Sequence, residues 1–287
     1  MNRRITILAM RDKTPNGPES KLVAVVVPMR KRLELTPDEQ ISLRHLLYFL
    51  GRYEKYIVVP SSLKIHWPDF GVKRFDDRFF GSAAAYIRMT LSPEFYEAFS
   101  DYRYILIYHL DALVFSDQLT QWCDRDFDYV GAPWVVHEDA PYAGRKAFEG
   151  KVGNGGFSLL KIESVLKVIY SQRYCIDPRE YWESHYSSKP RLVRFCNLPK
   201  KYFKYLKQFN NARWEISRWN NSDDSFFANR STHYDPSFKI PSVEVALGFA
   251  FECLPRYCFE LNNRTLPFGC HAWARYEREF WEPYLLR

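Results

Sequence analysis

The sequence predicts an α/β protein, and three observations near its start predict this fold class. Residues 22–27 form a continuous apolar run that ends at Pro28, which is typical of a strand buried on both faces. Residues 36–39, Thr-Pro-Asp-Glu, form a capping box with Pro at the first helical position, and the helix they open ends at Gly51. A second strand is predicted over 56–59. A strand, a capped helix and a strand in so short a span form a βαβ unit, whose crossover is almost always right-handed.

The remaining elements follow in order along the chain. Two helices are predicted over 82–90 and from Ser92, and residues 104–108 are the most strand-like stretch of the chain. Residues 172–220 mix aromatic and basic side chains without a clear period, so no element is predicted there. The other predicted elements are strands over 127–130 and 157–160, a helix over 162–169, a helix from about Asp223, and short strands over 243–245 and 249–252.

The length of 287 residues allows one large domain or two small ones. Residues 1–20 are polar and contain Pro and Gly, so we expect a loose N-terminal arm. We expect residues 21–287 to form a single domain. Its first part, to about residue 120, has the pattern of a nucleotide-binding α/β half, and the second part, 121–287, is more irregular.

Charge and aromatic content both suggest the kind of partner. Lys and Arg exceed Asp and Glu by 41 to 34, a net charge of +7, which favours anionic partners such as nucleotides, nucleic acid or an acidic membrane face. Basic residues cluster at 30–32 and again at Lys200, Lys201, Lys204 and Lys207, although either cluster can be a solvated face. The 22 Phe, 20 Tyr and 8 Trp residues suggest a surface that stacks on flat ligands.

Cysteine spacing and hydropathy indicate the compartment. No two of the six cysteines have the two-residue gap of a zinc knuckle or redox motif, so we expect reduced thiols in a cytoplasm. The apolar stretch at the start is too short for a secretory signal, and nowhere do about 18 apolar residues run together. We therefore expect a soluble cytoplasmic protein whose contact with a membrane, if any, is peripheral.

Four segments carry candidate chemistry. Ligands of open α/β sheets bind beyond the carboxyl ends of strands, where Asp111 follows the strand over 104–108 and can hold a divalent cation or cap a turn. Gly155 and Gly156 allow a close backbone approach to a ligand, or form a bare turn. Asp223-Asp224 can cap a helix, or one of the two can be a general base. His271 can be a metal ligand or a hydrogen-bonded structural residue. No phosphate-binding G-x-x-x-x-G-K-[ST] or G-x-G-x-x-G loop is present, which excludes the corresponding ATPases and dinucleotide oxidoreductases.

The order of these segments, together with three phrases, resembles a known family. Gly-Ala-Pro-Trp at 131–134, Gly-Asn-Gly-Gly-Phe-Ser-Leu at 153–159 and Pro-Phe-Gly-Cys-His-Ala-Trp at 267–273 are similar to a largely uncharacterised bacterial family assigned to glycosyltransferases of the GT-A fold. The resemblance extends from about Val23 to Trp281. It implies a Rossmann-like mixed sheet flanked by helices in one catalytic domain, with a nucleotide-binding half and, over 121–287, an acceptor half.

The resemblance also implies roles for particular residues. Asp111 in His109-Leu110-Asp111 occupies the place of the D-x-D motif and would bind Mn²⁺ or Mg²⁺, with His271 as the late metal ligand. The first Asp of the usual motif is His109 here, which leaves open whether this residue contacts the ribose or the metal. Asp224 would be the catalytic base. The further implied contacts are Gly155 and Gly156 with donor sugar and acceptor, Pro28, Arg30, Asp77 and Arg88 with the nucleotide, and Trp134, Phe157 and Trp273 stacking on sugar and uracil.

The function implied is transfer of a hexose from a nucleoside-diphosphate sugar, with UDP-hexose preferred, to a hydroxyl of a glycan or lipid-linked glycan at the inner face of the membrane. Inversion by the Asp base is expected, and retention stays open. Two alternatives remain. A sugar-nucleotide nucleotidyltransferase would want a glycine-rich loop after the first strand, which Val27-Pro28-Met29-Arg30 lacks. A non-catalytic nucleic-acid- or glycan-binding module would explain the charge and the rings, but it needs no convergence of Asp111, Asp224 and His271, so no nucleic-acid partner is expected.

Overall fold

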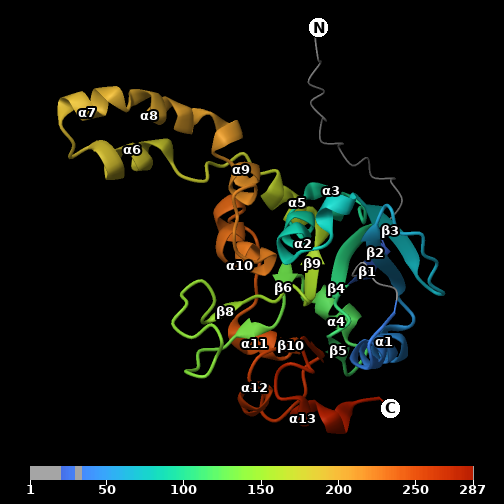
Figure 1. The fold of residues 1–287 in the computed structure, drawn as a ribbon. Helices are drawn as coiled ribbons and strands as arrows, with labels where there is room; N and C mark the ends of the chain where they lie inside the picture. Colours follow the sequence, from blue (N-terminus) through green and yellow to red (C-terminus); the bar gives the residue numbers. More distant parts are fainter. Residues whose placement is uncertain (1–20, 30–33, 287) are drawn as a thin grey trace.

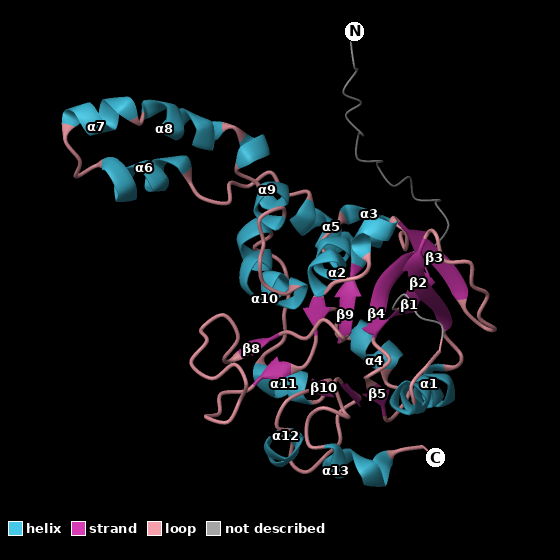
Figure 2. Ribbon diagram, in the orientation of Figure 1, coloured by secondary structure: helices cyan, strands magenta, loops and turns pink. Residues whose placement is uncertain are grey.

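A six-stranded mixed sheet organises the fold (Figures 1 and 2). The computed structural model describes residues 21–29 and 34–286, so the predicted arm over 1–20 and Arg30 lie outside the described residues. The strand order is β3-β2-β1-β4-β9-β6, in which the first four strands are parallel and β9 is antiparallel to both β4 and β6. The strands are β1 (Lys21–Pro28), β2 (Glu54–Pro60), β3 (Gly71–Phe75), β4 (Tyr102–Tyr108), β6 (Tyr129–Val130) and β9 (Phe157–Lys161).

Alternate residues of the central strands belong to two different hydrophobic cores. Val25 of β1 packs in one core with Leu46, while its neighbour Val26 packs in the other with Met89 and Val165. This alternation follows from the pleat of a strand, and it explains why residues 22–27 of β1 form a continuous apolar run. Helices therefore cover both faces of the sheet, and the predicted mixed α/β sheet flanked by helices is confirmed. The flanking helices are α1 (Pro37–Leu50), α2 (Ala83–Thr90), α3 (Pro93–Glu97), α4 (Leu119–Asp124) and α5 (Ile162–Ile169).

The predicted capping box at the start of α1 is formed in the structure. The hydroxyl of Thr36 accepts a hydrogen bond from the backbone N–H of Glu39 (3.3 Å), and the Glu39 carboxylate accepts one from the backbone N–H of Thr36 (2.8 Å). We expect Thr36→Ala to lower the free energy of unfolding by about 1 kcal/mol, because one of these bonds is lost. Urea unfolding measures the change. Thr36→Ser retains the side-chain oxygen and should keep most of the stability, and equal losses in both variants would contradict the capping role.

A small second sheet, which lies below the main one in the view of Figure 1, connects distant parts of the chain. It has the order β10-β11-β5, with β5 (Leu113–Val114), β10 (Ala250–Phe251) and β11 (Gly269–Cys270). The strand predicted over 249–252 is thus confirmed by β10. The strand predicted over 243–245 is wrong, because these residues form helix α11 (Val243–Leu247), whose N-cap Ser242 accepts a hydrogen bond from the N–H of Val245. The other short elements are the β7 (Pro133–Trp134) and β8 (Lys151–Val152) hairpin, α12 (Pro255–Leu261), α13 (Arg278–Trp281) and the 3₁₀ turns η1 (Asp77–Phe79) and η3 (Glu282–Tyr284).

Residues 172–220, for which no element was predicted, are mainly helical. They contain α6 (Pro178–Tyr186), α7 (Arg191–Cys196), α8 (Leu198–Tyr205), η2 (Lys207–Phe209) and α9 (Ala212–Ile216). Helices α7 and α8 bury none of their residues, and α8 places its apolar side chains on one face that stays outside the core. The helix predicted from about Asp223 is confirmed as α10 (Asp223–Tyr234).

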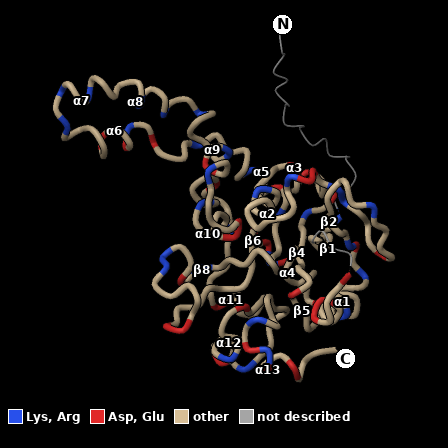
Figure 3. Tube along the Cα trace, viewed as in Figure 1, with Lys and Arg blue, Asp and Glu red and all other residues tan. Residues whose placement is uncertain are grey.

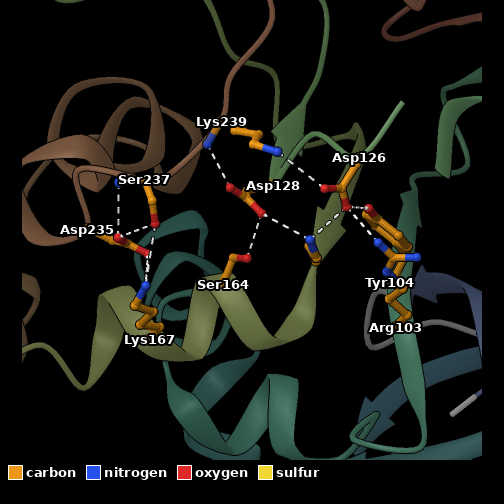
Figure 4. A network of polar contacts seen from close by, with 10 residues as sticks. Arg103, Tyr104, Asp126, Asp128, Ser164, Lys167, Asp235, Ser237 and Lys239 are labelled. Atoms are coloured by element: carbon orange, nitrogen blue, oxygen red, sulfur yellow. Dashed lines mark hydrogen bonds and ion pairs between the residues drawn. The ribbon is translucent and has the colours of Figure 1, made fainter. Parts of the chain in front are cut away.

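A polar network fastens the second half of the chain to the edge of the main sheet (Figure 4). The buried carboxylate of Asp128 accepts hydrogen bonds from the Ser164 hydroxyl on α5 (2.6 Å) and from the backbone N–H of Lys239 (2.7 Å). Nearby, Asp126 pairs with Lys161 (2.7 Å) and with the Lys239 ammonium (3.3 Å). A buried carboxylate needs such partners, and here they join β6, α5 and the segment that follows α10.

Two further features concern the cysteines and the helices. All six cysteines are free in the structure. Among the helices of the described residues, none combines the length and apolar character needed to span a bilayer.

Candidate active site

Pairing in the small sheet brings Asp111 and His271 together across 160 residues of sequence. Cys270 of β11 is the antiparallel partner of Leu113 in β5, so the residue after Cys270 lies beside the residues before Leu113. The backbone N–H of Trp273 donates to the carbonyl of Asp111 (3.2 Å). As a result, Nε2 of His271 lies 3.2 Å from Oδ1 of Asp111.

A second carboxylate holds the other side of the His271 ring. Strands β10 and β11 are parallel, with Phe251 opposite Cys270. Glu252, the residue after Phe251, therefore lies beside His271, the residue after Cys270. Nδ1 of His271 lies 3.0 Å from Oε1 of Glu252. Burial lowers the pKa of the imidazole, but the contacts with Asp111 and Glu252 outweigh this and raise it to about 10. Burial raises the pKa of Asp111, yet its hydrogen bond to His271 and the charges of His271 and His109 hold it below the usual range.

His109 completes a group that fits a divalent metal ion. One ligand atom from each of His109, Asp111 and His271 lies within 4.8 Å of the others. The hydroxyl of Tyr86 lies 2.8 Å from Nε2 of His109 and fixes that ring. Oδ1 of Asp111 is buried and faces Nε2 of His271 at 3.2 Å, so two of the atoms that could bind an ion already point at each other. Two imidazoles and one carboxylate are a donor set for first-row divalent metals.

The Gly155-Gly156 segment lies against this group. Gly156 immediately precedes β9, and its carbonyl accepts a hydrogen bond from the backbone N–H of His109 (2.8 Å), which follows the adjacent β4. A Cβ on Gly156 would overlap Nε2 of His271, and a Cβ on Gly155 would lie 3.0 Å from Oδ1 of Asp223. Side chains of the chain itself, His271 on one side and Asp223 on the other, therefore lie close to these glycines, and the approach of a ligand stays a prediction.

The Asp223-Asp224 pair begins α10 beside the same glycines. Oδ2 of Asp224 accepts hydrogen bonds from the backbone N–H groups of Asn154 (3.1 Å) and Gly155 (3.0 Å). Its other oxygen accepts from the N–H of Ser225 (2.6 Å), so the residue also caps its own helix in part. Burial, and then the charge of the neighbouring Asp223, raise the pKa of Asp224 to about 7. Burial raises the pKa of Asp223 as well.

A cavity of about 550 Å³ opens beside the candidate metal group, at the carboxyl ends of β1 and β4. Among the residues proposed from sequence, Pro28, His109 and Asp111 line it. Arg88 is exposed on α2 and is not among its lining residues. Asp77 is also outside the lining, and its carboxylate accepts hydrogen bonds from the backbone N–H (3.0 Å) and the hydroxyl of Ser62. The volume is within the range of ligand pockets.

The expected stacking role of three aromatic residues is wrong. Trp134 is 4% exposed, and Phe157 and Trp273 are fully buried, so none presents a ring face to a ligand. Phe157 instead packs against Phe249 and Phe268 in the core under the site. Many of the aromatic rings near the candidate motifs therefore belong to the hydrophobic core beneath the site.

Three residues of the site were missed from the sequence. Tyr86 and Glu252 orient the two imidazoles, as described above. Asn154 has a left-handed backbone (φ 81°), and its side-chain oxygen accepts the N–H groups of Gly156 (2.9 Å) and Phe157 (3.2 Å), which fixes the glycine segment. For Asn154, the local signal in the sequence was an Asn before two glycines, because Asn tolerates positive φ better than most residues.

A family model described as a protein of unknown function, DUF5672, matches residues 69–271. The chain belongs to this family. The match extends over His109, Asp111, Asp224 and His271, and it ends at the last of them. No curated protein matches the chain.

Three solved structures similar to this chain are glycosyltransferases of low sequence identity. Glycosyltransferase GlyE of Streptococcus pneumoniae TIGR4 is 14% identical, with a TM-score of 0.39 over 92% of this chain, which spans 60% of the GlyE chain. A glycosyltransferase involved in glycosylation of the major capsid of PBCV-1 is 9% identical, with a TM-score of 0.42 over 92% of this chain and 98% of that one. The galactosyltransferase LgtC, solved with donor and acceptor sugar analogs, is 13% identical, with a TM-score of 0.41 over 86% of each chain.

Proposed function

We propose that this protein is a metal-dependent glycosyltransferase that moves a hexose from a nucleoside-diphosphate sugar, UDP-hexose first, to a hydroxyl of a glycan or glycoconjugate. The observation that carries the proposal is the position of Gly155-Gly156 between His271 and the Asp223-Asp224 pair. A donor diphosphate on the His271 side and an acceptor hydroxyl on the Asp224 side would meet at a backbone without side chains. This arrangement supports transfer better than binding alone.

His109, Asp111 and His271 would hold the metal, and Glu252 would keep the His271 ring in place through Nδ1. Between Mn²⁺ and Mg²⁺ the two imidazoles favour Mn²⁺, because Mg²⁺ prefers oxygen ligands. When bound, the ion would supply positive charge that stabilises the departing nucleoside diphosphate. The cavity beside the group, lined in part by Pro28, Phe79 and Tyr86, would receive the nucleotide.

Asp224 would be the base that takes the proton of the acceptor hydroxyl. The hydroxyl oxygen would attack the anomeric carbon as the bond to the nucleoside diphosphate breaks, with inversion. The raised pKa of Asp224 suits this role, since a base is most effective when its pKa is close to the working pH. The N–H groups of Asn154 and Gly155 hold the carboxylate in a fixed orientation. Asp223, beside Gly155, supports the role through its charge.

Thermal unfolding with UDP tests the proposal. At UDP concentrations about 100 times Kd, the expected stabilisation is about 2.7 kcal/mol, which corresponds to a rise in Tm of several degrees. The rise should need Mn²⁺, and UDP or Mn²⁺ alone should give much less. Stabilisation by an oligonucleotide and none by UDP with Mn²⁺ would instead favour a nucleic-acid-binding module. Release of UDP from a panel of UDP-hexoses, followed by NMR of the product, then identifies the sugar and the stereochemistry.

A further inference from the structure

Helices α6, α7 and α8 form a hairpin that projects from the rest of the molecule (Figure 1). Contacts between α8 and α6 hold it together: the ammonium of Lys201 lies 5.3 Å from the ring of Trp182, and that of Lys204 lies 4.9 Å from the ring of Tyr181. Helices α7 and α8 bury no residue against the domain. The proposed glycosyl transfer has no use for this hairpin, so its surface needs a separate explanation.

The α7 and α8 part of this hairpin carries Lys and Arg but no Asp or Glu (Figure 3). Seven Lys and Arg residues and no Asp or Glu lie between positions 189 and 207, a net charge equal to the +7 of the whole chain. None of the seven forms an ion pair with a carboxylate of the described residues. Three of them, Arg191, Arg194 and Lys200, lie on exposed positions near the tip of the hairpin.

Large apolar side chains are exposed on the same segment. Of the fifteen exposed large hydrophobic residues in the described part of the chain, eight lie between 192 and 209. Leu192 is 74% exposed, Phe195 70% and Tyr202 64%. The surface of a monomeric protein rarely carries a cluster of large apolar side chains unless the cluster binds a partner. The eight residues are Leu192, Val193, Phe195, Tyr202, Phe203, Tyr205, Leu206 and Phe209.

We propose that the α6–α8 hairpin docks on an anionic lipid bilayer. Lys and Arg next to exposed Leu, Phe and Tyr form the pattern of an interfacial helix, whose cations pair with anionic headgroups while its apolar side chains enter the boundary of the acyl region. Charge alone would equally suit RNA, but the aliphatic Leu192 and Val193 gain nothing from a phosphate backbone. The hairpin leads through α9 into α10, whose first turn carries Asp223 and Asp224. Docking would thus hold the candidate active site close to a bilayer.

Co-sedimentation of the full-length protein with vesicles tests the proposal. We expect binding to phosphatidylcholine vesicles that contain about one quarter phosphatidylglycerol, and at least about tenfold weaker binding to pure phosphatidylcholine. The double variant Arg191→Glu/Arg194→Glu should weaken binding to the anionic vesicles by at least about tenfold. Lys64→Glu/Lys146→Glu changes the net charge equally at exposed positions elsewhere and should bind as the parent does. The variant Leu192→Ser/Phe195→Ser should lose the binding that persists at high salt.

Cys196 provides a second measurement, because it is exposed on α7 while four of the other cysteines are buried and Cys175 is half-buried. An environment-sensitive dye on Cys196 should shift its emission to the blue with anionic vesicles. Equal vesicle binding by the parent and by both hairpin variants would overturn the proposal. So would RNA binding by the parent without any vesicle binding. Neither result depends on UDP or Mn²⁺, so this test and that of the proposed function can fail separately.

Discussion

Asp224→Asn is expected to abolish sugar transfer while leaving nucleotide binding intact. Loss of a general base lowers kcat by about 10²- to 10⁴-fold. An amide cannot take the proton of the acceptor hydroxyl, yet its oxygen can still accept the N–H groups of Asn154 and Gly155, so the glycine segment should keep its place although the bond from the Ser225 N–H is lost. The measurements are UDP release from a UDP-hexose and the rise in Tm with UDP and Mn²⁺. Asp101→Asn, an exposed carboxylate outside the site, is the control. Near-normal turnover by Asp224→Asn would remove the base assignment.

The pH dependence of the reaction gives a sharper form of this prediction. A base must be ionised to act, so kcat/KM should fall as the pH falls through the pKa of Asp224. Because burial and the charge of Asp223 raise that pKa to about 7, the fall should begin near neutral pH and not near pH 4. Asp223→Asn removes the neighbouring charge, lowers the pKa of Asp224, and should move the acid limb to lower pH. An acid limb that stays in place in Asp223→Asn would contradict the coupling of the two carboxylates.

The central sheet could be predicted because its signals are local. The apolar run of β1 and the capping box of α1 each need only a few neighbouring residues, and both are present in the structure. Helices α7 and α8 were not predicted in this way: α7 has only six residues, and the apolar face of α8 packs against no core. The wrong strand over 243–245 has a related cause: two Val residues favour a strand, but the Ser242 cap and the burial of Ala246 and Leu247 favour α11.

The candidate site was predictable only where its residues are chemically distinctive. Asp111 and His271 were identified because a carboxylate directly after a strand and a histidine in an aromatic loop are both possible metal ligands. Glu252 was not, since its place beside His271 depends on the parallel register of β10 and β11, which no local pattern shows. The aromatic residues show the converse error: their proximity to the motifs in sequence suggested stacking, but burial assigns Trp273 and Phe157 to the core.

Gly156→Ala should distinguish the role of the metal group from that of the Asp223-Asp224 pair more clearly than removal of a metal ligand would. Its Cβ would overlap Nε2 of His271, so the ring must turn away from Asp111 and Glu252. We expect Mn²⁺-dependent binding of UDP to weaken by about 10- to 100-fold, as is usual when the orientation of a metal-binding histidine is lost. Calorimetric titration of UDP in the presence of Mn²⁺ measures the change, and circular dichroism checks that the variant is folded.

Gly155→Ala is the matched control, because it adds the same methyl group one residue earlier on the other side of the segment. Its Cβ would lie 3.0 Å from Oδ1 of Asp223, so it should disturb the acid pair and lower turnover while Mn²⁺-dependent UDP binding stays near that of the parent. Opposite effects from two adjacent glycines would be difficult to obtain from general destabilisation, which would reduce binding and turnover in both variants. If Gly156→Ala binds UDP with Mn²⁺ as tightly as the parent, His271 does not hold the metal, and the ion would have to be assigned to other ligands.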